Sequence, residues 1–173
     1  FYLGQVYPQA NPPWHYSLVM LLAATPVILV VGALIGACRW RAPAARFASL
    51  WVAVVLGADL LSQTHYGGVR HLLSVLPAIA LLAAVGFQWA LDRIRLASPL
   101  PRTLLACAFV GGWLFLVIDL VVVHPYYDAY LNSIARRVWS KQPEYVVELE
   151  VWGSVYKEGA EWLAENAEPG STV

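Results

Sequence analysis

The chain has 173 residues, of which 60% are hydrophobic and only 13% are charged. A soluble domain of this size carries about 25% charged residues, so the composition excludes an ordinary soluble domain. Eleven basic and eleven acidic residues give a net charge of zero, which offers no basic footprint for nucleic acid. The composition therefore indicates a membrane protein.

Four apolar stretches are each long enough to cross a bilayer as a helix. A hydrocarbon core of about 30 Å needs about 20 residues, because an α-helix rises about 1.5 Å per residue. The four stretches are residues 17–38, 47–64, 72–91 and 104–123. Pro26 in the first stretch and Pro77 in the third are tolerated in membrane helices, and both predict kinks.

Arginines alternate between the links that join these stretches. Residues 39–46 and 92–103 together hold six of the eleven basic residues. Because positively charged loops stay in the cytoplasm, residues 1–16, 65–71 and 124–173 are expected outside. The sequence thus predicts a multi-pass protein of the cell membrane, or of the endoplasmic reticulum membrane if the source is eukaryotic.

The tail over 124–173 has a more polar pattern than the rest of the chain. Apolar residues recur there at helical spacing and predict a helix lying along the outer interface. They are Tyr127, Leu131, Ile134 and Val138. Residues 145–152 are typical of a strand, and a helix capped by Ser154 is expected to run through Asn166. The expected fold is therefore an all-α membrane protein with four transmembrane helices, an interfacial helix and the start of a small, incomplete extracytoplasmic α/β domain.

Two acids, Asp59 and Asp119, fall inside the predicted spans, each about 7 Å from the outer end of its helix. Acids within a membrane are costly and usually face a cavity or a partner. One interpretation is a polar outer chamber in which they act as ligands or as acid and base. The alternative is that they reach the headgroup layer or pair with Arg70.

The densest polar cluster near the predicted membrane surface is the loop over residues 64–71, which includes Tyr66, Arg70 and His71. The planar guanidinium of Arg70 suits a phosphate, and His71 adds a second donor. This pattern predicts a site for a lipid phosphate at the outer surface. The alternative is an Arg that anchors the helix end against ordinary lipid headgroups.

Aromatic and histidine side chains also gather on the predicted outer side. Trp14 and Tyr16 could stack on a sugar ring, although an aromatic belt at the membrane surface explains them equally well. The four histidines have no zinc-type spacing, so neither a metal nor another cofactor is expected.

The order of four segments resembles the later part of the polyprenyl-phosphate-sugar-dependent glycosyltransferases of the GT-C class. These segments are PPWHYSLVMLLAATP (12–26), YGGVRHLLSVLPAIALLAA (66–84), HPYYDAYLN (124–132) and ELEVWGSVYKEGAEWLAEN (148–166). Together they extend over essentially the whole chain, and the chain is similar to the protein O-mannosyltransferase and lipid A aminoarabinose transferase families. The expected Gly pair after Asn132 is missing from residues 133–144.

The resemblance implies transfer of a sugar from a polyprenyl-phosphate donor to an acceptor hydroxyl on a protein, lipid or glycan. It places Arg70 and His71 near the donor phosphate, and His124, Tyr126 and Tyr127 at the cavity rim. The catalytic carboxylate of this class lies near the protein's N-terminus, so it is expected before Phe1 and no catalytic residue is assigned here. We therefore expect the chain to be an inactive segment by itself. The alternatives are a transporter fragment with Asp59 and Asp119 along an ion path, or a scaffold.

Overall fold

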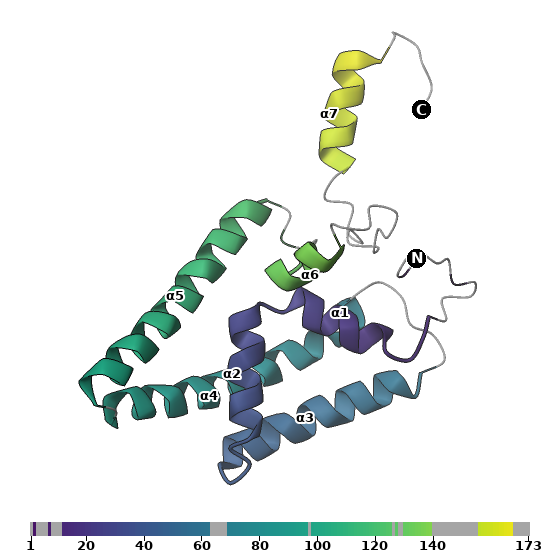
Figure 1. The fold of residues 1–173 in the computed structure, drawn as a ribbon. Coiled ribbons are helices and arrows are strands. Elements are labelled where there is room, and N and C mark those ends of the chain that lie inside the picture. Colours follow the sequence, from purple (N-terminus) through teal and green to yellow (C-terminus); the bar gives the residue numbers. More distant parts are fainter. Residues whose placement is uncertain are drawn as a thin grey trace.

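The computed structural model describes residues 2, 7, 12–62, 69–96, 98–125, 127, 130–139 and 156–167. Its elements are α1 (Tyr16–Ala24), α2 (Val27–Ala37), α3 (Pro43–Leu60), the 3₁₀-helix η2 (Arg70–Val75), α4 (Leu76–Leu96), α5 (Pro99–Val123), α6 (Ser133–Trp139) and α7 (Tyr156–Asn166), as Figure 1 shows. Regular structure in these ranges is helical, with no β-strand. The strand predicted over 145–152 lies outside the described residues, so helix α7 is the described part of the expected α/β domain.

Three helical segments are long and apolar enough to cross a membrane. They are Pro43–Leu60, Arg70–Leu96 and Pro99–Val123. This finding identifies the chain as a membrane protein, whereas the kind of membrane and the orientation stay predictions. Residues 17–38 do not form the single kinked helix that the sequence predicted, because they fold as α1 and α2 with a bend of 114° between them. The two helices make a fourth span only if the bent pair is counted as one.

The break between α1 and α2, which we call the elbow, is caused by Pro26. Proline has no N–H to donate, and its ring disfavours the helical conformation of the residue before it. Thr25 is accordingly extended, with φ −98° and ψ 130°, and Pro26 itself has ψ 136°. Two successive non-helical residues turn the chain, where the sequence had predicted only a kink. Helix α2 has 11 residues and rises about 16 Å, which is half of a bilayer core.

Three further prolines lie where a helix begins. Pro43 and Pro99 occupy the first turns of α3 and α5, where the missing N–H has no helical partner in any case. Pro77 lies in the first turn of α4, directly after η2. The kink predicted at Pro77 is thus replaced by a change from 3₁₀ to α-helix at Leu76.

The tightest helix packing is between α2 and α4, and glycines make it possible. A Cβ atom at Gly36 would lie 1.9 Å from the carbonyl oxygen of Leu82, and one at Gly86 would lie 2.0 Å from that of Gly32. Only glycine permits this approach of two backbones. Next to this crossing, Ala45 of α3 and Ala78 of α4 are fully buried in one cluster with Leu82.

The helices place the two Arg-rich turns away from the tail. In Figure 1 the turns after α2 and α4 lie toward the lower left, while α1, α6 and the C-terminal end of α5 lie on the upper side.

Candidate functional site

The elbow leaves the backbone carbonyls at the end of α1 without helical partners, and Asn132 supplies partners for them. Its side-chain Nδ2 donates to the carbonyl oxygen of Leu22 at 2.7 Å and to that of Thr25 at 2.9 Å. Its backbone N–H donates to the carbonyl of Ala23 at 2.8 Å. The Thr25 hydroxyl donates to the carbonyl of Leu21 at 2.7 Å. Because a buried carbonyl without a partner is costly, these contacts make the elbow possible in an apolar setting.

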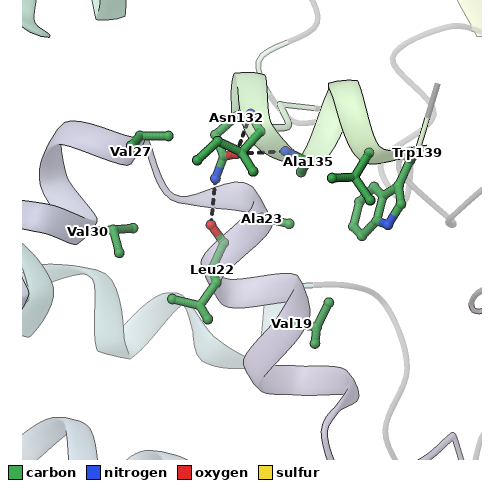
Figure 2. A pocket seen from close by; sticks show the side chains of 10 residues that line it. Val19, Leu22, Ala23, Val27, Val30, Asn132, Ala135 and Trp139 are labelled. Atoms are coloured by element: carbon green, nitrogen blue, oxygen red, sulfur yellow. Dashed lines mark hydrogen bonds between the residues drawn. The ribbon is translucent and has the colours of Figure 1, made fainter. Parts of the chain in front are cut away.

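The same Asn132 begins helix α6. Its Oδ1 accepts hydrogen bonds from the backbone N–H groups of Ile134 at 3.1 Å and Ala135 at 3.0 Å. These are the second and third residues of the helix, so Asn132 is an N-cap. Figure 2 shows the side chain between α6 and Leu22 of α1. One buried amide therefore joins the tail to the broken first span.

A second polar link joins the tail to α5. Asp119 is 5% exposed and is the residue of α5 that the structure buries. Its carboxylate forms an ion pair with Arg136 of α6 and accepts a hydrogen bond from the Tyr130 hydroxyl at 2.8 Å. For Asp119, this ion pair with Arg136 takes the place of the alternative in which it pairs with Arg70. A buried carboxylate that is charged needs such a partner, since desolvation of an isolated charge is expensive.

The predicted interfacial helix is shorter than the sequence pattern indicated. It covers Ser133–Trp139, because the Asn132 cap fixes its start. Leu131 and Ala135 are buried beside Ala23, whereas Ile134 and Val138 are 60% and 57% exposed. Leu131 of the predicted apolar stripe thus packs on α1, whereas Ile134 and Val138 stay available for the predicted contact with the membrane interface. Ala135 packs in one cluster with Leu131 and Ala23 of α1.

Arg70 and His71 begin η2, next to an apolar groove. This groove, which we call the α1–α4 groove, has a volume of about 300 Å³ and is lined by side chains of α1 to α4, including Leu21, Leu56 and Ile79. Leu72, two residues after Arg70, is buried in one cluster with these three side chains. Arg70 is half-buried and His71 is exposed. The two predicted phosphate ligands therefore lie near one end of the groove.

The remaining predicted site residues are spread over several elements. The His124 ring nitrogen Nδ1 lies 3.0 Å from the Tyr127 hydroxyl, so these two exposed side chains are together after α5. Trp14 is exposed, whereas Tyr16 is buried edge-on against Tyr2 at a ring distance of 4.9 Å. Of the two rings that could stack on a sugar, Trp14 and Tyr16, only Trp14 is therefore exposed.

Three predicted site residues remain, namely Asp59, Tyr66 and Tyr126. Asp59 is half-buried in the last turn of α3. Tyr66 and Tyr126 lie outside the described residues.

Among the residues that the structure describes, no three His, Cys, Asp or Glu side chains come together as a possible metal site. None of the protein-family models, curated proteins or solved structures compared with the chain matches it.

Sequence reasoning missed Tyr130, Asn132 and Arg136 as the residues that organise this region. One signal was available, because Asn directly before an apolar helical run is a strong N-cap. The Asp119–Arg136 pair had no local signal. The two residues belong to different helices, and only the fold brings them together.

We expect Tyr130 to make stability depend on alkaline pH. Burial raises the pKa of the Tyr130 hydroxyl above its ordinary value of 10.0. The hydroxyl is thus harder to ionise in the folded protein, so its stabilisation is complete below pH ~10 and is lost as pH rises through the folded pKa. The measurement is the free energy of unfolding from about pH 8 to pH 11 in the parent protein, Tyr130→Phe and the exposed Tyr127→Phe. The parent and Tyr127→Phe should lose more stability than Tyr130→Phe, and equal losses would contradict the prediction.

Proposed function

We propose that the chain is the C-terminal membrane part of a glycosyltransferase that uses a polyprenyl-phosphate sugar. The reaction moves the sugar to an acceptor hydroxyl at the extracytoplasmic face. Arg70 and His71 bind the donor phosphate, and the isoprenoid chain lies along the α1–α4 groove. The catalytic carboxylate is expected in a part of the protein before Phe1.

The position of Arg70 at one end of an apolar groove is the observation that supports this proposal. A polyprenyl phosphate combines a long apolar chain with a compact anion, so its site needs an apolar channel that ends at cationic donors. Leu72 and Val75 of η2 are fully buried against Leu21, which fixes η2 at that end of the groove. The guanidinium of Arg70 is suited to phosphate oxygens and to the charge of a phosphate leaving group.

The ion pair of Asp119 favours an enzyme over a transporter. An ion path through Asp119 would need its carboxylate to exchange ligands near the bilayer midplane. Instead, Asp119 is held by Arg136 and Tyr130 at the tail end of α5. This arrangement suits a carboxylate that stabilises the fold around a site at one membrane face.

Binding of decaprenyl phosphate to Arg70→Ala, in lipid nanodiscs, tests the proposal. We expect the affinity to fall about tenfold or more, since a hydrogen bond to a charged group contributes about 1.5–3 kcal/mol. Binding of decaprenol, which lacks the phosphate, should not change. In a longer protein that includes the catalytic carboxylate, Arg70→Ala is expected to lose most sugar transfer.

Arg102→Ala is the matched control, because Arg102 is exposed in the first turn of α5, a helix that does not line the α1–α4 groove. This variant should bind decaprenyl phosphate like the parent protein. An equal loss in both variants would mean that the effect is general electrostatic attraction. Unchanged binding by Arg70→Ala would remove Arg70 from the site and contradict the proposal.

A further inference from the structure

The segment Tyr130–Trp139, which we call the strap, contacts two parts of the membrane region that have little contact with each other. At its start, Asn132 is bonded to the end of α1. Along α6, Arg136 is paired with α5. Helix α5 is otherwise exposed along most of its length, because only 6% of its apolar stretch is buried against other residues. The strap is thus a connection between the elbow and α5.

The two attachments differ in strength and in kind. Asn132 is 6% exposed and makes two hydrogen bonds through Nδ2, two through Oδ1 and one through its backbone N–H. The second attachment is made to Asp119 by two side chains, the ion pair of Arg136 and the hydrogen bond from the Tyr130 hydroxyl. Asp119 is buried, but the Arg136 side chain is 34% exposed. Arg136 therefore reaches solvent and can be hydrated if it leaves Asp119. The Asn132 end is the fixed end, and the Arg136 attachment is the one that can release.

The strap forms one wall of an apolar groove beside the elbow. This groove, which we call the elbow groove, has a volume of about 320 Å³ and lies between α6 and the α1–α2 bend. Figure 2 shows Val27 and Val30 of α2 on one side of it, and Trp139 at the far end of α6. Ala23 is 6% exposed beneath the strap, in one cluster with Leu131 and Ala135. Access to Ala23 therefore reports whether the strap is closed.

We propose that the strap is a conformational gate that turns about Asn132 and is fastened by the Asp119–Arg136 ion pair. Release of the pair lifts α6 from the elbow, widens the elbow groove and uncovers Ala23, while the Tyr130 hydroxyl still holds Asp119. The hydrogen bonds of Asn132 keep the elbow intact during this motion. The gate is independent of the proposed sugar transfer, so its test uses no substrate.

Labelling of a cysteine beneath the strap tests the gate. Cys38 and Cys107 are exposed and are first replaced by Ala, and Ala23→Cys is then introduced. The rate of modification by N-ethylmaleimide is measured in lipid nanodiscs for Asp119→Asn and Arg136→Gln. Each variant removes one charge of the fastening pair, and Asp119→Asn keeps the side-chain shape. We expect either change to raise the labelling rate about tenfold or more.

Two matched controls make the same chemical changes at residues outside the ion pair. Arg137→Gln changes the next, exposed arginine of α6, and Asp59→Asn changes the acid at the end of α3. Both should label at the parent rate. Circular dichroism and gel filtration check each variant, and if one test variant does not fold, the other decides. Labelling of the folded test variants at the control rate would overturn the gate.

Discussion

Asn132→Ala should lower the free energy of unfolding by about 3–5 kcal/mol, among the largest effects expected for a single substitution here. The change removes both Nδ2 hydrogen bonds and leaves the carbonyls of Leu22 and Thr25 without these donors. Each buried polar group left without a partner costs about 1–3 kcal/mol. Loss of the cap on α6 adds about 1 kcal/mol. The measurement is unfolding by SDS in mixed micelles.

Two variants separate the contributions to this loss. Asn166→Ala is the control, because Asn166 makes one exposed hydrogen bond to the Trp162 carbonyl, and its removal should cost less than about 1 kcal/mol. Asn132→Asp keeps an acceptor for the cap of α6 but loses the Nδ2 donors, so it should be destabilised almost as much as Asn132→Ala. A small effect of Asn132→Asp would mean that the contacts with the elbow contribute little.

The sequence predicted those features of the fold that depend on local patterns. The apolar runs located α3, α4 and α5, and the end predicted for the last span at residue 123 agrees with the end of α5 at Val123. The orientation that the arginines predict stays a prediction. Pro26 was correctly identified as the point where the first span deviates. Each of these predictions depends only on helix geometry and on the residues of the segment itself.

The extent of the bend at Pro26 could not be predicted because it depends on a distant residue. A proline within a membrane helix is usually a kink, since a full break leaves several carbonyls without donors. Here the donor for the Thr25 carbonyl comes from Asn132, 107 residues later in the chain. No local pattern relates these two residues. The predicted phosphate site at Arg70 likewise stays a prediction, because it depends on a ligand.

The close packing of α2 has a signal in the sequence that span length and loop charge do not use. Gly32 and Gly36 are four residues apart in an apolar helix, which is the spacing of glycines at close helix contacts in membranes. Both glycines lie against α4, near Gly86. Span length and loop charge describe each helix alone, whereas this motif describes a pair. It would therefore have predicted that α2 packs closely against another helix.

Gly36→Ala and Gly86→Ala should each lower the free energy of unfolding by about 3 kcal/mol. A Cβ atom at either position would lie within 2.0 Å of a backbone oxygen of the facing helix, which no side-chain rotation can relieve. The helices must separate, and α2 then loses contacts along its length. At Gly32 the nearest atom is the Phe87 ring at 2.5 Å, a side chain that can move, so Gly32→Ala should cost less.

Gly57→Ala and Gly111→Ala are the controls for the glycine variants, because a Cβ atom at either position meets nothing within 4 Å. Each makes the same chemical change within a predicted span and gains about 0.5–1 kcal/mol of helix propensity. These variants should be as stable as the parent or more stable. If all four alanine variants were equally stable, α2 and α4 would not need contact of their backbones. The α1–α4 groove, which both helices line, would then lose the rigid wall that a fixed binding site requires.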